Sequence, residues 1–119
     1  MATKIKQYDV WLADLNPRFG TEPGKLRPVV IIQTDLLNET GHPSTLICPI
    51  TTNVIPNASI LRVHLSKKEA GTTKPSDILV DQARAIDNQR FKKKIGSLDK
   101  ISVKTLKENL ITVFDLVSA

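Results

Sequence analysis

Short stretches that alternate between apolar and polar residues run through the chain and predict a protein built mainly from β-strands. Residues 8–15 (YDVWLADL) alternate in this way, whereas 27–34 (RPVVIIQT) form the β-branched run typical of a buried strand. Pro and Gly interrupt the pattern at 16–25 and predict a long surface loop. Further strands are predicted over 44–51, 60–65, 77–81 (followed by a bend or another strand to 87) and 95–98.

The end of the chain has the pattern of an amphipathic helix. Its apolar stripe recurs at helical spacing, and Ser102 is the predicted N-cap. A single helical turn is predicted over 35–40, capped by Thr34 or Asp35 and closed by Gly41. Many short strands followed by one helix predict a mainly β fold, a small β-barrel with a packed C-terminal helix, as one domain over 1–119. The stripe consists of Leu106, Leu110, Val113 and Val117, widened by Val103, Ile111 and Phe114.

Composition narrows the class of protein. Only three Phe, one Tyr and one Trp are present, so the core must be aliphatic. The longest aliphatic run, 29–32, is far shorter than the roughly 20 residues that span a bilayer, and residues 1–10 lack the apolar stretch of a secretory signal. The single cysteine, Cys48, excludes an internal disulfide and a Cys-cluster zinc site. We therefore expect a small cytoplasmic domain without a membrane segment.

The charge is unevenly distributed along the chain. The net charge is +5, yet residues 1–60 hold equal numbers of basic and acidic groups. Residues 84–107 contain eight Lys and Arg residues but only two acidic residues, Asp87 and Asp99. Such a block is typical of a face that binds a polyanion, or alternatively of a solvated surface. The cluster 92–94 (KKK) has the same two interpretations, a surface that attracts phosphates or a solvated turn.

Familiar catalytic motifs are absent from the sequence. His42 and His64 have no neighbouring Asp, Glu, His or Cys at the spacing of metal ligands, so we expect no metal site. Cys48 lies within an apolar strand and is interpreted as a core thiol. No phosphate-binding loop, dinucleotide fingerprint or nucleophile elbow occurs, and no cofactor is expected.

The loop from 16 to 25 and the strand after it hold the most suggestive polar groups. The loop presents Glu22, and Arg27 stands where the chain enters the buried strand. Binding sites commonly lie on loops held by a rigid scaffold, and the planar guanidinium of Arg suits phosphate recognition. A simple ion pair that pins the loop is the alternative interpretation of Glu22 and Arg27.

These segments, taken together, resemble the MazF/PemK family, the ribonuclease toxins of toxin–antitoxin pairs. The resemblance begins with DVWLADLNPRFGTEPGKLRPVVII, in which Gly-x-Glu precedes Arg-Pro, and continues through 48–53 (CPITTN) and 77–87 (DILVDQARAID). It ends with Arg90, 95–98 (IGSL) and the terminal helix, so it covers nearly the whole chain. It implies a compact SH3-like β-barrel with a C-terminal helix, and a homodimer that cleaves single-stranded RNA without a metal.

The resemblance also assigns roles to residues. Arg27 and Thr51 correspond to the catalytic Arg and Thr of the family, and Glu22 to a further implicated position. RNA carries its own nucleophile, the 2′-OH, so Arg27 would stabilise the phosphoryl oxygens while Thr51 donates to one of them or positions the 2′-OH. Whether Glu22 is the base or Arg27 assists the leaving oxygen stays open.

Further residues are expected to contact RNA. Phe19 is expected to stack on a base, whereas Trp11 is better interpreted as a core residue. Asp81 has the alternative role of orienting Arg84 or capping a turn. The predicted RNA-binding set is Arg18, Phe19, Thr21, Lys25, Thr52, Asn53, Asp81, Gln82 and Arg84.

The sequence departs from the family pattern at three positions. Tyr8 replaces the usual Gly before Asp9, and Thr21 stands where some relatives place a His before the Glu. Leu79 replaces an Arg found in some relatives, so no catalytic role is assigned to it.

The expected partners are single-stranded RNA and a cognate antitoxin that inhibits through an acidic segment imitating phosphates. Two other hypotheses remain: a noncatalytic toxin of the same fold that blocks a protein such as DNA gyrase, and a noncatalytic RNA-binding module.

Overall fold

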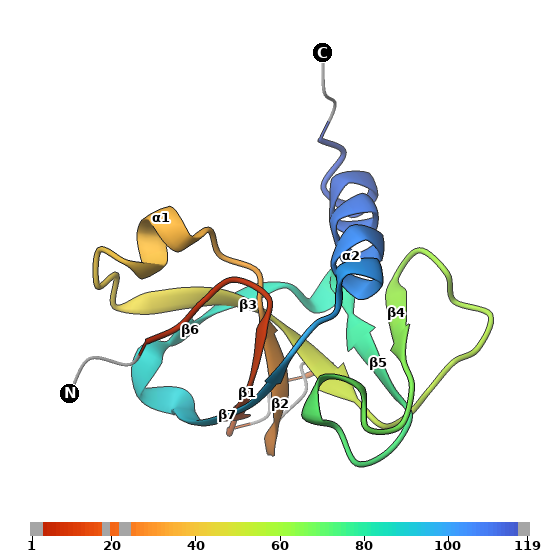
Figure 1. The fold of residues 1–119 in the computed structure, drawn as a ribbon, viewed down its shortest axis with the longest axis horizontal. Helices are drawn as coiled ribbons and strands as arrows, with labels where there is room; N and C mark the ends of the chain where they lie inside the picture. The colour runs from red at the N-terminus through yellow and green to blue at the C-terminus, as the bar shows by residue number, and fades with distance from the viewer. Residues whose placement is uncertain (1–3, 18–19, 22–24, 117–119) are drawn as a thin grey trace.

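The chain folds into one curled antiparallel sheet with a helix packed against it, as seen in the computed structural model (Figure 1). The structure describes residues 4–17, 20–21 and 25–116. These described residues form seven strands, two α-helices and three 3₁₀ turns. The strands are β1 (Asp9–Asp14), β2 (Leu26–Ile31), β3 (Ser44–Thr51), β4 (Arg62–Leu65), β5 (Ser76–Leu79), β6 (Arg84–Asp87) and β7 (Phe91–Ser97); the helices are α1 (Asp35–Asn38) and α2 (Lys100–Val113); the 3₁₀ turns are η1 (Glu69–Gly71), η2 (Val80–Gln82) and η3 (Asn88–Arg90).

The sheet has the strand order β4-β5-β3-β2-β1-β7, and β6 pairs with β3 outside this path. β3 therefore lies at the centre: its first half pairs with β6, its end pairs with β5, and β2 runs along its other edge. This arrangement confirms the predicted mainly β fold with a C-terminal helix. The sheet is not closed into a barrel, because no ladder joins β7 to β4 among the described residues.

Both faces of the sheet bury aliphatic side chains. One cluster contains Val10, Val30, Ile50 and Ile78 and is completed by Leu106 of α2. The other contains Val29, Ile31 and Ile47, with Trp11 packed against it. The separation follows from the pleat, because successive side chains of a strand point to opposite faces. α2 therefore covers one face, and a functional site must use the other face or the sheet edges.

Three local predictions need correction. The lysines 92–94 do not form a turn but lie within β7, at the edge of the sheet. All three lysine side chains are exposed, so this part of the strand lacks the alternation of apolar and polar residues that predicts a half-buried strand. α2 is capped by Asp99, whose carboxylate accepts a hydrogen bond from the Ser102 N–H at 2.8 Å, so Ser102 is not the N-cap. Ile111 and Phe114 are at least half exposed and do not join the buried stripe. Val117, the last position of that stripe, lies outside the described residues.

The chain passes very close to itself where η1 meets β7. A Cβ placed on Gly96 would lie 2.5 Å from the backbone oxygen of Ala70, and one on Gly71 would lie 2.1 Å from that of Ile95. Gly71 also has a φ of +81°, which L side chains rarely adopt. Only glycine fits at these two positions.

We expect Gly96→Ala to lower the free energy of unfolding by about 3 kcal/mol, because backbone rather than a flexible side chain must move to admit the methyl group. Urea unfolding followed by circular dichroism measures the change. The matched control is Ser97→Ala at the neighbouring exposed position of β7. Equal stabilities of the two variants would contradict the close approach.

Candidate functional site

Arg27 and Thr51, far apart in the sequence, both lie just beyond the same end of the β2–β3 ladder. The last pair of the ladder is Val29 with Pro49, and Arg27 and Thr51 each stand two residues further out on their own strands. Residues two apart on a strand share a face, and directly opposite residues point to the same side. Both side chains therefore lie on the face away from α2, and both are partly exposed.

Paired residues of the neighbouring strands continue from Thr51 as a row of side chains on the same face of the sheet. Thr51 pairs with Asp77 of β5, and Asp77 pairs with His64 of β4. On the other side, Arg27 pairs with Ala13 of β1. A threonine, an aspartate and a histidine thus stand side by side over three adjacent strands, and Arg27 lies on the same face of the next strand, β2. Sequence reasoning missed Asp77 and His64 as members of this site, because only the strand pairing brings them to Thr51.

The loop after Thr51 is held in place by Thr51 itself. Its hydroxyl oxygen accepts a hydrogen bond from the Asn53 N–H at 3.1 Å. The hydroxyl proton remains available for a further acceptor, since a threonine hydroxyl both donates and accepts. Thr52 and Asn53 are exposed at the start of this loop. The predicted contact residues 51–53 therefore form one continuous surface segment.

Asp77 is the buried anchor of this region. Its side chain is fully buried, and it accepts hydrogen bonds from the Ile55 N–H at 2.9 Å and from Arg62 Nη1 at 3.1 Å. His64 Nδ1 lies 2.6 Å from its other oxygen. Burial acts to raise the pKa of the Asp77 carboxyl, but these hydrogen bonds outweigh burial and hold the pKa below its ordinary value. Arg62 also donates to the Asn53 carbonyl oxygen at 2.6 Å, so the cluster fixes the 53–55 loop.

The first loop of the site is only partly described. Arg18, Phe19 and Glu22 lie outside the described residues, so their predicted roles remain predictions. Thr21 is exposed. Lys25, also exposed, has a φ of +69° and is fastened by its N–H to the side-chain oxygen of Asn16 at 2.8 Å.

Arg90 also contributes to this loop, a role that the sequence did not indicate. Its guanidinium donates hydrogen bonds to the backbone oxygens of Asp14, at 3.0 Å, and of Asn16. This member of the basic block therefore stabilises the entrance to the loop. By contrast, Lys92, Lys93 and Lys94 are exposed along β7, with Lys94 Nζ 3.4 Å from a carboxylate oxygen of Asp9.

The segment 81–84 leads into β6 and lies beside the middle of β3, along the edge of β3 that does not pair with β2. Arg84 pairs with Ile47, so it shares the face of Arg27 and Thr51, and it is partly exposed. Gln82 is partly exposed, and Asp81 is exposed in η2. Within the described part of the chain, no hydrogen bond or ion pair joins Asp81 to Arg84, and no side chain caps η2. The structure therefore does not bear out the alternative role of Asp81, orienting Arg84 or capping a turn.

The side chains of Trp11 and Cys48 pack in the interior of the protein. Trp11 is half-buried and packs edge-on against Phe91, with ring centroids 5.8 Å apart, as the core interpretation predicts. Cys48 is fully buried, and burial raises the pKa of its thiol to about 12, so it is not a nucleophile near neutral pH.

Among residues 4–17, 20–21 and 25–116, no group of three or more His, Cys, Asp or Glu side chains is arranged to hold a metal ion. Nor does any helix in those segments have the length and apolarity to cross a membrane.

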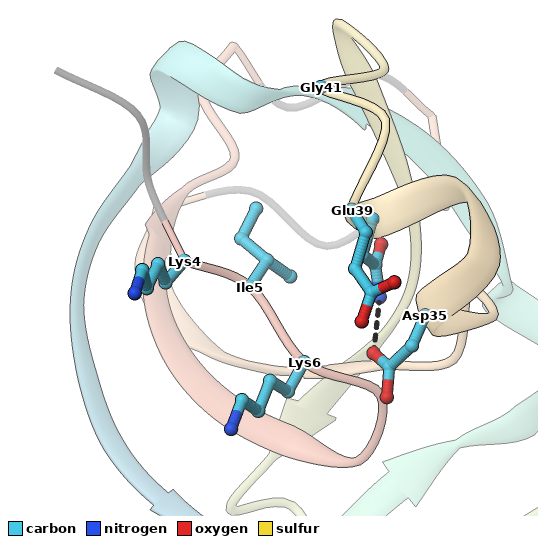
Figure 2. A pocket seen from close by; sticks show the side chains of 7 residues that line it. Lys4, Ile5, Lys6, Asp35, Glu39 and Gly41 are labelled. Carbon is cyan, nitrogen blue, oxygen red and sulfur yellow. Dashed lines mark hydrogen bonds between the residues drawn. The ribbon is translucent and has the colours of Figure 1, made fainter.

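A separate cavity of about 430 Å³ lies between the N-terminal segment and α1 (Figure 2). Lys4 and Lys6 line one side, and Asp35 and Glu39 line the other. The Gln7 N–H and the Asn38 amide both donate to Asp35, and these hydrogen bonds lower the pKa of its carboxyl. Because the opposed charges balance, this cavity does not provide a field for a polyanion. It also lies next to the beginning of β3, whereas Thr51 is at the end of that strand.

Comparison with known proteins places the chain in a family. The family model described as "PemK-like, MazF-like toxin of type II toxin-antitoxin system" matches residues 6–114. The chain belongs to this family of toxins. It is 38% identical over 95 residues to the protein named Endoribonuclease EndoA of Bacillus subtilis, covering 80% of this chain and 81% of that protein.

Solved structures show the same fold. MazF from Deinococcus radiodurans aligns with a TM-score of 0.80 and 16% identity, over 96% of this chain and 99% of that chain. A MazE–MazF structure from the same organism aligns with a TM-score of 0.75 and 16% identity, over 97% of this chain and 99% of that chain. At this identity the likeness concerns the fold alone.

Proposed function

We propose that this toxin is a metal-independent, sequence-selective endoribonuclease that cleaves single-stranded RNA, in particular mRNA. The observation that carries the proposal is that Arg27 and Thr51 lie on the same face of the sheet, both just beyond the same end of the β2–β3 ladder. The relative from Bacillus subtilis is named an endoribonuclease, which supports the same activity class.

In the proposed reaction the substrate supplies the nucleophile. The 2′-oxygen attacks the adjacent phosphorus, forming the 2′,3′-cyclic phosphate, while the bond from phosphorus to the 5′-oxygen breaks and leaves a 5′-hydroxyl. The proton of the 2′-OH passes to a base, and the departing 5′-oxygen receives one. The Arg27 guanidinium suits the charge that develops on the phosphoryl oxygens, and the Thr51 hydroxyl suits donation to one of them or positioning of the 2′-OH. Glu22 remains the candidate base, and assistance of the leaving oxygen by Arg27 remains the alternative.

The surroundings provide a path for the strand. Arg84 lies on the same face as Arg27 and Thr51, and the exposed residues Thr52, Asn53 and Lys25 are close to them along the chain. Basic and amide groups of this kind bind the backbone and the base edges of single-stranded RNA. Phe19, Arg18 and Thr21 of the first loop, with Gln82 and Asp81 beside β3, complete the proposed contact set.

The proposed protein partners are a cognate antitoxin and a second copy of the chain. A MazE–MazF structure from Deinococcus radiodurans supports an antitoxin for the present toxin. An acidic antitoxin segment would occupy the RNA-binding surface and imitate phosphates there. Membership of the toxin family supports the proposed homodimer.

The activity is tested by incubating the purified chain with a long single-stranded RNA in excess EDTA and mapping the product ends. We expect cleavage at a recurring short motif, with cyclic-phosphate and 5′-hydroxyl ends. Rising salt should slow cleavage by weakening the contacts to phosphates. Intact RNA, from protein that still arrests growth on expression, would overturn the proposal and direct attention to a protein target such as DNA gyrase.

A further inference from the structure

A second depression lies beside the row that contains Thr51. This cavity of about 380 Å³ is formed by the loop after β3 and by the facing ends of β4 and β5. Its walls are mainly apolar, with Val54 and Pro56 on one side and Pro75 on the other. His64 and Lys67 are its nitrogen-bearing side chains. Flat apolar walls with few polar groups are typical of a pocket for a ring-shaped ligand.

His64 is fixed in orientation by the buried carboxylate beneath it. With Nδ1 2.6 Å from Asp77 Oδ1, the ring donates its Nδ1 hydrogen to the carboxylate and directs Nε2 away from it. Asp77 is itself held by Arg62 and by the Ile55 N–H. The His64 side chain is 42% exposed although its partner is fully buried. The imidazole is therefore a preoriented group whose second nitrogen is available to a ligand.

The position of His64 relative to Thr51 determines which part of a substrate it can reach. Thr51, Asp77 and His64 are successive members of one cross-strand row. Opposite residues have Cβ atoms about 5 Å apart, so His64 stands on the order of 10 Å from Thr51. That is too far to contact the phosphate held by Thr51 and Arg27. It is a suitable distance for a neighbouring nucleotide, since single-stranded RNA is recognised through unstacked, splayed bases.

We propose that the cavity beside His64 accepts one unstacked RNA base next to the cleavage point, and that His64 Nε2 reads the edge of this base. The inference rests on the proposed ribonuclease function and deepens it, because it identifies His64 as a specificity-determining residue. Asp77 is a positioning residue that acts through His64. A base fits this cavity better than a phosphate does, because the prolines and Val54 offer contact area to a ring, whereas Lys67 alone offers a flexible positive charge.

The test compares the cleavage motifs of His64 variants on an RNA pool of random sequence, read by sequencing of the product ends. We expect His64→Ala to lose about tenfold of the discrimination at one motif position, which is the worth of one good base contact. The preferences at the other motif positions should stay near those of the wild type. His64→Gln, which can place a polar atom near the position of Nε2, should retain a preference at that position.

His42→Ala is the matched control. His42 is the other histidine of the chain; it is exposed and lies in the loop before β3, with Nδ1 2.8 Å from the Ser44 carbonyl oxygen. We expect its motif to equal that of the wild type. Asp77→Asn, which keeps a side-chain oxygen but loses the carboxylate charge, should weaken discrimination at the same position as His64→Ala.

Three outcomes would count against the inference. Wild-type cleavage at a motif that His64→Ala leaves unchanged would overturn the inference alone. A uniform slowing on every sequence, together with a lower unfolding temperature, would show that His64 only supports the fold. A wild-type protein that cleaves no RNA would overturn the proposed function, and the inference with it.

Discussion

Replacing Arg27 with alanine is expected to lower the rate of RNA cleavage by about 100- to 1000-fold, the usual cost of removing one donor that stabilises developing charge. Arg27 lies on the same face of the sheet as Thr51, away from α2, and we expect its guanidinium to bind two phosphoryl oxygens of one phosphate. The rate constant for a single turnover, measured at saturating enzyme on one RNA of known motif, reports this loss directly. Arg27→Lys should recover only part of the rate, because lysine restores the charge without the planar pair of donors.

The control for Arg27→Ala is Lys104→Ala. Lys104 is an exposed cation of α2, the helix that covers the opposite face. Removing it also lowers the net charge by one, but we expect the rate to stay within about twofold of the wild type, the range of a screened surface charge. Arg27 has other contacts in the folded chain, so the unfolding temperature of each variant must accompany the rates. Wild-type rates from a folded Arg27→Ala protein would contradict the proposed role.

The sequence predicted the elements well where a single physical signal dominated. The β-branched run before Ile32 and the alternation around Val10 specified their strands, because both patterns arise from burial. The basic stretch 92–94 was not predicted to be part of a strand. An edge strand can expose its side chains on both faces and then lacks the alternation that marks a half-buried strand.

The candidate site was predictable only in part. Arg27 and Thr51 could be proposed from motifs, but their placement on one face at the same end of the β2–β3 ladder depends on the register of that ladder, which no local pattern specifies. Asp77 immediately precedes the apolar residues 78–80, and its neighbours in the sequence do not indicate that its side chain is buried. Its partners, Arg62 and His64, come from another strand and alternate there with Val63 and Leu65. The polar cluster is therefore a product of tertiary pairing.

A large effect on stability is expected at Asp77. Asp77→Ala should lower the free energy of unfolding by about 3 kcal/mol, because it leaves the Arg62 guanidinium mostly buried without its carboxylate and the Ile55 N–H without its acceptor. Glu108→Ala, at an exposed carboxylate of α2, is the control and should change stability by less than about 0.5 kcal/mol. Urea unfolding at pH 7 measures both variants.

The pH dependence of this difference tests the cause. Because the folded-state pKa of Asp77 lies below its ordinary value of 3.8, the unfolded chain binds the proton more readily than the folded chain does. The stabilisation by the carboxylate is therefore complete above the ordinary pKa and is lost as the pH falls through the lowered pKa. The gap between wild type and Asp77→Ala should accordingly narrow as the pH falls below about 4. A gap that stays constant on acidification would mean that packing, rather than the charge on Asp77, holds the 53–55 loop beside Thr51.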